Sequence, residues 1–170
     1  IISPIRDEVK LVNDRNMSRL DSELLTYEST IVQGEDYEAP TIVVNGVTKI
    51  DQKYIDYEIN QLKKRMNGEL TLKLKIGAHV MCVANLDMDG KQQIVNGSQG
   101  IIEDIIDGYP VVRYTNGVVK HMINHSWKSE EIPGLSLMQV PLILSWAITI
   151  HKAQGITLDS AIIDAGDKIF

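Results

Sequence analysis

The strongest periodic pattern along the chain lies between Asp51 and Gly68. Apolar side chains recur there at helical spacing, which predicts a helix through Met66 with one buried face. Asp51 is suited to cap the first turn because its carboxylate can accept backbone N–H bonds, and Asn67-Gly68 is a typical helix stop. The predicted buried face consists of Tyr54, Ile55, Ile59, Leu62 and Met66.

The N-terminal residues have the pattern of one α/β step. Residues 1–5 predict a short strand, and residues 6–20 predict a helix with Val9, Val12 and Met17 facing inward. Residues 22–50 contain short β-rich pieces without a long period of either kind. We expect them to form an irregular excursion that has room for one hairpin.

From Thr71 onward the pattern changes to alternation of apolar and polar residues, interrupted by turn signals. Five β-rich runs within roughly 55 residues predict a small barrel. Asn116-Gly117 is the clearest hairpin turn, because both residue types tolerate the positive φ angles of tight turns. The other pairs of this kind are Asp89-Gly90, Asn96-Gly97 and Asp107-Gly108.

The C-terminal part returns to buried, apolar segments. Residues 135–150 are almost wholly apolar, and their periodicity does not separate strand from helix. Residues 160–164 are typical of an interior strand of a parallel sheet. The predicted fold class is therefore α/β with an inserted all-β barrel. The α/β domain is assigned to residues 1–70 and 129–170, and the barrel to residues 71–128.

Composition and charge restrict the function. The formal net charge of −6 and a pI near 5.2 argue against a protein that coats nucleic acid with its whole surface, so any DNA contact must be local. The single cysteine, Cys82, excludes an internal disulfide framework and lies in an apolar run. Without a bilayer-length apolar stretch or a signal peptide, we expect a soluble, intracellular protein. Both ends of the chain look cut from something longer.

One short segment, AITIHKAQGITLD at residues 147–159, carries the most suggestive chemistry. Thr149, His151 and Lys152 are donors suited to phosphate oxygens, which fix register without reading sequence. Gly155 would let the backbone approach a ligand closely, and Gln154 can bridge a phosphate or a water. The alternative is a surface turn between two buried elements, with Gln154-Gly155 as a helix stop.

Residues 72–164 resemble the C-terminal half of Pif-type and RecD-like DNA helicases, of superfamily one, class B. The matching segments are LKLKIGAHVMCVANLD, IVNGSQGII, PVVRYTNG and QVPLILSWAITIHKAQGITLDSAIID, in the order and spacing of that family. The first 20 residues resemble the family's motif IV region more loosely. The resemblance implies a RecA-like second motor domain that carries a small barrel of the Src-homology-three type.

The resemblance also implies a function and assigns residues to it. Family members move along single-stranded DNA in the five-prime to three-prime direction and unwind duplexes, driven by ATP hydrolysis between two motor domains. Motif V, here residues 149–157, would contact DNA through Thr149, His151 and Lys152. Gln154 and Gly155 would face the nucleotide, with Gln154 in a catalytic role. Such helicases serve DNA replication, repair and recombination.

Three further positions are candidates for ligand contact. Asn96 and Ser98 lie in a predicted turn that is equally suited to contact DNA phosphates, although Gln99 stands where family members often have a basic residue. Trp127 could stack on a base, whereas Trp146 is a better core residue. Arg6, just after the first strand, could present a cation to the γ-phosphate across the cleft, or it could be an ordinary surface arginine that opens a helix.

Cofactors and partners follow from what the chain contains. It has no Gly-x-x-x-x-Gly-Lys-Ser/Thr loop, so ATP and Mg²⁺ would be held mainly by the first motor domain of the same parent chain, and this chain alone should be inactive. A zinc site at His121 and His125 is disfavoured because no second ligand pair accompanies them. The expected partners are single-stranded and fork DNA, without a membrane. The alternative is a non-enzymatic module that binds nucleic acid or protein.

Overall fold

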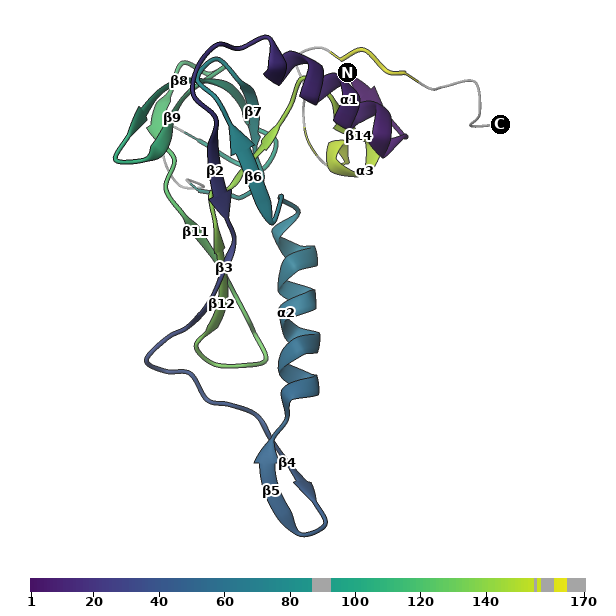
Figure 1. Ribbon diagram of the computed structural model, residues 1–170, viewed down its shortest axis with the longest axis vertical. Helices are drawn as coiled ribbons and strands as arrows, with labels where there is room; N and C mark the ends of the chain where they lie inside the picture. The colour runs from purple at the N-terminus through teal and green to yellow at the C-terminus, as the bar shows by residue number, and fades with distance from the viewer. Residues whose placement is uncertain (87–92, 155, 157–160, 165–170) are drawn as a thin grey trace.

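A narrow arm built on one long helix projects from a wider head in the computed structural model (Figure 1). The structure describes residues 1–86, 93–154, 156 and 161–164. The predicted Asp89-Gly90 turn therefore lies outside the described residues. Both the N-terminus and residues 161–164 lie at the head, while the arm is formed by internal segments of the chain (Figure 1).

The head contains a five-stranded antiparallel sheet with the strand order β10-β9-β8-β7-β13. Two of its connections are the predicted hairpins. Asp107 and Gly108 have φ angles of 50° and 79° between β8 and β9, and Gly117 has a φ of 86° between β9 and β10. The strands are β7 (His79–Cys82), β8 (Gln99–Ile106), β9 (Tyr109–Tyr114), β10 (Val119–His121) and β13 (Leu142–Leu144).

A second pair of strands, β2 (Leu25–Glu28) and β6 (Thr71–Leu74), runs antiparallel beside this sheet. β6 buries alternate residues, Leu72 and Leu74, as the sequence pattern predicts. Both side chains belong to the main apolar core of the head. Its other fully buried members include Ala78, Val80, Cys82, Ile94, Ile102, Val112, Met122, Val140 and Leu142.

The arm consists of α2 (Gln52–Met66) and a three-stranded sheet of β11 (His125–Lys128), β12 (Leu135–Gln139) and β3 (Thr30–Gln33). The helix prediction is confirmed: Asp51 Oδ1 accepts a bond from Tyr54 N at 3.1 Å, and Asn67 ends the helix with a φ of 51°. Leu62 and Met66 are 0% exposed against this sheet, and burial of one such side chain stabilises by about 1.5–3 kcal/mol.

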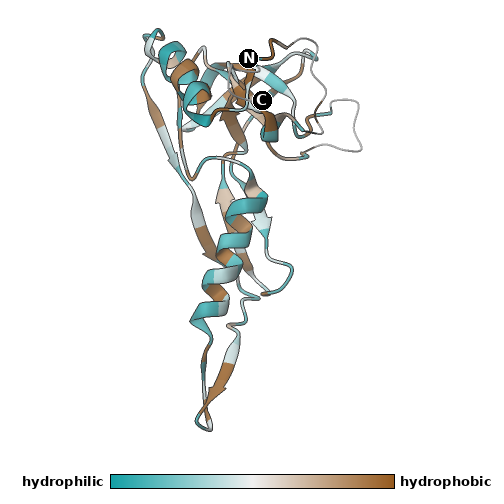
Figure 2. Ribbon diagram, turned by 90° about the vertical axis from the view of Figure 1, so that its right-hand side faces the viewer, coloured by the Kyte–Doolittle hydropathy of each residue, from teal (hydrophilic) through white to brown (hydrophobic). Residues whose placement is uncertain are grey.

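The tip of the arm is the hairpin of β4 (Thr41–Val44) and β5 (Val47–Ile50). Its turn is Asn45-Gly46, with φ angles of 53° and 78°, so residues 22–50 do contain one hairpin. Every residue of both strands is exposed, and Figure 2 shows hydrophobic residues along them. A two-stranded hairpin of this kind is only marginally stable by itself.

The opposite end of the molecule is the α/β step. β1 (Ile2–Ser3) leads into α1 (Arg6–Ser18) and pairs in parallel with β14 (Ile148–Thr149), which leads into α3 (Ile150–Ala153). Ile163 forms an isolated parallel bridge with Ile2, in agreement with the predicted parallel pairing at this position. The predicted burial of residues 160–164 is wrong for Ile163, which is 69% exposed because no described helix or strand covers it.

The chain is therefore a mixed helix and sheet structure. Residues 135–150, for which strand and helix were both open, contain β12, β13 and β14 and end at the first residue of α3. The five-stranded sheet crosses the predicted boundary at residue 128, because β13 pairs with β7. The division into residues 1–70, 71–128 and 129–170 stays a prediction.

Candidate nucleic-acid interface

The predicted DNA-contact segment begins where β14 turns into α3. Thr149 is the N-cap of α3, and its Oγ1 accepts a bond from Lys152 N at 3.4 Å. The hydroxyl still has one proton to donate, which suits it to a phosphate oxygen. The cap fixes the direction in which the short helix presents His151, whose side chain is exposed.

A buried asparagine anchors this segment to the rest of the α/β step. Asn13 on α1 is 8% exposed, donates to Ala147 O at 3.0 Å and accepts from Ala147 N at 2.9 Å. This pair of bonds resembles one rung of a sheet and fixes the backbone two residues before Thr149. Asn13 was not predicted as a site residue, since nothing about a polar residue on a predicted helix indicates that it will be buried against a distant strand.

Lys152 is held by an acidic residue from a distant part of the chain. Its Nζ lies 3.3 Å from Glu69 Oε1, and its side chain is 22% exposed. Gln154 follows α3 as its C-cap in an extended conformation and is exposed. Gly155, the other predicted nucleotide contact, lies outside the described residues.

The second predicted segment is a tight turn before β8. Gly97 has a φ of 98°, Ser98 N donates to Val95 O at 2.9 Å, and Ser98 Oγ accepts from Val95 N at 3.0 Å. The turn prediction is confirmed. Ser98 Oγ is partly committed to the turn, and Asn96 is exposed with its backbone N–H bonded to Asn85 Oδ1 at 2.9 Å.

These two segments meet in the structure. A Cβ atom added to Gly97 would lie 2.6 Å from Ile156 Cγ2, a distance that real Cβ atoms do not show. Ile156 and Ala153 pack against a buried cluster that includes Met81 and Val83 of the head. The turn at Gly97 and the residue Ile156 are therefore in direct contact, which brings the two predicted segments together.

Trp127 borders the same cluster. It lies on β11, is half-buried, and packs against both the arm core and the cluster of Met81 and Val83. The edge of the His125 ring meets it with a centroid distance of 4.6 Å, and burial lowers the pKa of His125. Only part of the indole is exposed for base stacking. Trp146 stacks on His79 at 5.4 Å and packs against the head core, as predicted for a core residue.

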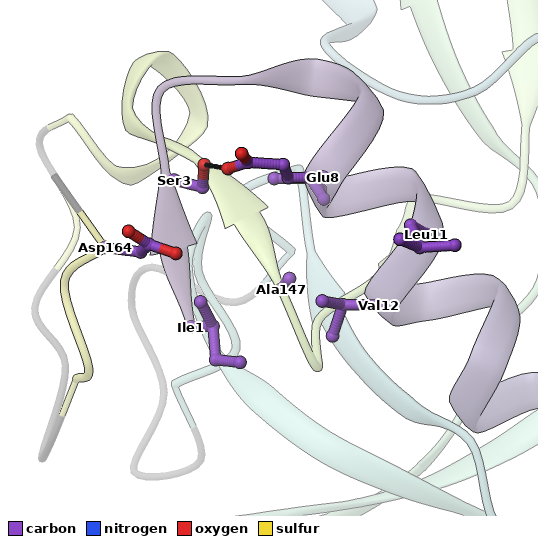
Figure 3. A pocket seen from close by; sticks show the side chains of 8 residues that line it. Ile1, Ser3, Glu8, Leu11, Val12, Ala147 and Asp164 are labelled. Carbon is purple, nitrogen blue, oxygen red and sulfur yellow. Dashed lines mark hydrogen bonds between the residues drawn. The ribbon is translucent and has the colours of Figure 1, made fainter. Parts of the chain in front are cut away.

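Arg6 is the first residue of α1, and its side chain is exposed. A hollow of about 180 Å³ lies between β1 and α1 (Figure 3), where Ser3 Oγ donates to Glu8 Oε2 at 2.7 Å. The lining is mostly apolar and includes Val12 and Ala147, but not Arg6. The structure therefore places Arg6 on the same α/β step as Thr149 without bringing the two side chains together in a pocket.

Within residues 1–86, 93–154, 156 and 161–164, no group of three His, Cys, Asp or Glu side chains could hold a metal ion. His121 Nε2 instead lies 2.9 Å from Ile106 O. No helix in the described part of the chain is both long and apolar enough to cross a membrane.

The comparisons with known proteins agree with this architecture. The family model described as "DNA helicase Pif1, 2B domain" matches residues 59–105, from α2 into β8. The ATP-dependent DNA helicase PIF1 of Danio rerio is 32% identical over 91% of this chain and 21% of its own length. The human PIF1 is 41% identical over 56% of this chain and 15% of its own length.

Solved structures show the same similarity. Unliganded Pif1 from Bacteroides sp aligns with a TM-score of 0.67 and 28% identity over 98% of this chain and 34% of that protein. Pif1 from Candida albicans aligns with a TM-score of 0.64 and 26% identity over 99% of this chain and 39% of that protein. Bacteroides Pif1 bound to single-stranded DNA aligns with a TM-score of 0.58, at 28% identity over 95% of this chain and 33% of that protein.

The fold and these matches define the class of protein to which the chain is related, the DNA helicases. Within that class it is related to the Pif1 helicases over most of its length, which confirms the resemblance seen in the sequence. The chain spans 21% of the length of the Danio rerio relative.

Proposed function

We propose that this chain is part of an ATP-dependent DNA helicase that moves on single-stranded DNA and unwinds duplexes. The names of the related proteins support this activity, and Bacteroides Pif1 has been solved with single-stranded DNA and with ADP-AlF4. Another related structure describes DNA unwinding at forked duplexes by two coordinating Pif1 helicases. Movement from the five-prime to the three-prime end rests on the resemblance alone.

The contact between Gly97 and Ile156 is the observation that carries the proposal. It joins the two segments whose residue types suit phosphate contact, one on the head and one on the α/β step. A tight contact of this kind transmits displacement, because well-packed interiors deform little. A shift of the segment from Thr149 to Gln154 in response to nucleotide would therefore move the DNA-facing turn at Asn96 and Ser98.

The finer architecture belongs to the same proposal. The parallel pair of β1 and β14, with α1 and α3, would be part of a RecA-like second motor domain. The antiparallel head sheet would be the Src-homology-three type barrel. Support comes from the parallel register of Ile2 with Ile148 and from the antiparallel hairpins of the head.

ATP and Mg²⁺ would be held mainly outside this chain, in the first motor domain of the full-length protein. Gln154 and Arg6 would add contacts to the nucleotide from this chain, because both side chains are exposed and could reach a nucleotide bound by another domain. Bound ATP would supply the driving force through hydrolysis. The residues of this chain would bind DNA and respond to the state of the nucleotide.

The test uses the full-length protein and measures ATP hydrolysis with and without single-stranded DNA. We expect DNA to stimulate hydrolysis, and Thr149→Val to reduce that stimulation because the hydroxyl is lost. Thr149→Ser is the matched control, since it keeps the hydroxyl that caps α3 and can donate to phosphate. DNA binding without any DNA-stimulated hydrolysis would contradict the helicase proposal and would favour the non-enzymatic module.

A further inference from the structure

The ion pair between Lys152 and Glu69 joins segments that are 83 residues apart in the chain. Lys152 follows Thr149 on α3, and Glu69 lies in the connection from α2 to β6 at the base of the arm. The Lys152 side chain is 22% exposed and that of Glu69 is 58% exposed. The lysine is therefore shielded from water more than its partner, although a ligand can still reach the pair.

The backbone that carries Glu69 is fixed by a buried side chain. Gln139 is 1% exposed, and its Nε2 donates to Glu69 O at 3.1 Å and to Leu70 O at 3.0 Å. Its Oε1 accepts a bond from Val140 N at 2.9 Å. Because the loop is held in this way, the Glu69 carboxylate stays close to α3.

We propose that the Glu69 carboxylate pairs with the Lys152 ammonium until a DNA phosphate displaces it, so that Glu69 affects DNA binding through Lys152. The inference rests on the proposed function, in which Lys152 contacts DNA. A carboxylate and a phosphate compete for the same cation, since both are anionic acceptors with similar hydrogen-bond geometry. Glu69 therefore lowers the net free energy gained when Lys152 contacts a phosphate. Lys152 on α3 leaves Glu69 only when DNA is bound.

The Lys152 contact has a signature in the salt dependence of binding. A free lysine that meets a single-strand phosphate releases condensed counterions and contributes about 0.7 to the slope of log affinity against log salt. A single surface carboxylate condenses no counterions, so pairing of Lys152 with Glu69 leaves this contribution to the slope unchanged, and loss of Lys152 should reduce the slope by about 0.7. The competition with Glu69 is therefore seen in the affinity.

The experiment measures fluorescence anisotropy of a labelled oligothymidine with the full-length protein over a series of salt concentrations. We expect Glu69→Gln to tighten binding roughly two- to fivefold, in line with the strength of partly exposed ion pairs, with little change in the slope. Glu103→Gln is the matched control. It removes a carboxylate on β8 that is paired with Arg113 on β9 of the head sheet.

Lys152→Gln in both backgrounds completes a double-mutant cycle. We expect it to weaken binding more in the Glu69→Gln background than in the wild type. If Glu69→Gln tightens binding equally with and without Lys152, or if Glu103→Gln tightens it as much, the effect is a general one of charge and the proposal is overturned. Unchanged or weaker binding of the Glu69→Gln variant would also overturn it. DNA-stimulated ATP hydrolysis is measured on the same samples, so failure of the helicase proposal is seen separately.

Discussion

Gly97 and Ile156 are in direct contact, and the contact leaves no room for a side chain at position 97. A methyl group there would lie 2.6 Å from Ile156 Cγ2 and 2.7 Å from Ile156 Cβ. Gly97 also has a φ of 98°, which residues with a Cβ rarely adopt. We expect Gly97→Ala to lower the free energy of unfolding by roughly 2–4 kcal/mol, from backbone strain and overpacking together, in urea denaturation.

Gly117→Ala is the control for backbone strain alone. Gly117 has a φ of 86°, but nothing lies within 4 Å of an added Cβ. Its loss of stability should therefore be about 1–2 kcal/mol, without the overpacking contribution. Equal losses for the two variants would show that Ile156 does not press on Gly97. In the full-length protein, Gly97→Ala should also reduce DNA-stimulated ATP hydrolysis more than Gly117→Ala does.

Asn13 stabilises the approach to Thr149 through its two bonds with Ala147. Asn13→Ala would leave a buried N–H and a buried C=O without their partner, so we expect a loss of roughly 2–4 kcal/mol of unfolding free energy. Asn16→Ala on the same helix is the control, since the Asn16 side chain donates to Val12 O within α1 at 2.8 Å. Thermal unfolding of both variants is the measurement, and similar melting temperatures would contradict the anchoring role.

The elements that could be predicted from the sequence are those whose signals are local. The helix Gln52–Met66 has its cap, stop and apolar face within one segment, and the turns at Asp107-Gly108 and Asn116-Gly117 are set by residue type. β2 and β3 carry no comparable pattern. They become strands because β6 and β12, each more than forty residues away along the printed sequence, offer a ladder of backbone partners.

The same reason limits prediction of the candidate site. Thr149, His151 and Lys152 are recognisable by residue type, and their role in DNA binding stays a prediction. Asn13 and Glu69 act through contacts made only in the tertiary structure, so nothing in their own sequence neighbourhood indicates a role. The structure therefore reveals the residues that hold the candidate site in place, which the sequence pattern does not indicate.

Cys82, the single cysteine of the chain, is predicted to react slowly in the folded protein. Its side chain is 0% exposed, and burial raises the pKa of the thiol above its ordinary value of 9.0. Reaction with Ellman's reagent at neutral pH should therefore be limited by unfolding and become fast in denaturant. Fast labelling of the native protein would contradict the burial of Cys82.

The raised pKa of Cys82 also predicts an alkaline loss of stability. Well below pH 9 the thiol is protonated in the folded and unfolded states alike, so it adds no pH dependence there. As the pH rises further, the unfolded thiol ionises first, and the free energy of unfolding falls until the folded thiol also titrates. Burial raises the pKa of Tyr114 as well and acts in the same direction. Cys82→Ala should flatten the alkaline slope in denaturation curves between pH 8 and pH 10 without abolishing it.

Substitution of Arg6 is expected to affect catalysis without lowering the stability of the protein. It opens α1, where the partial positive charge of the helix N-terminus disfavours a cation. Arg6→Gln is therefore expected to leave the free energy of unfolding unchanged or raise it by about 0.3–1 kcal/mol. If Arg6 stabilises the charge on the transferred phosphoryl group, the same variant of the full-length protein should lower kcat for ATP by about 10³-fold, with a smaller effect on KM.

Arg15 in the last turn of the same helix is the matched control for Arg6. A cation there interacts favourably with the helix C-terminus, so Arg15→Gln should cost about 0.3–1 kcal/mol of stability and leave ATP turnover intact. The two variants thus predict opposite patterns, loss of turnover without loss of stability for Arg6 and the reverse for Arg15. Full ATP turnover in the Arg6 variant would identify it as an ordinary surface arginine, because a residue that stabilises the transition state cannot be removed without slowing the chemical step.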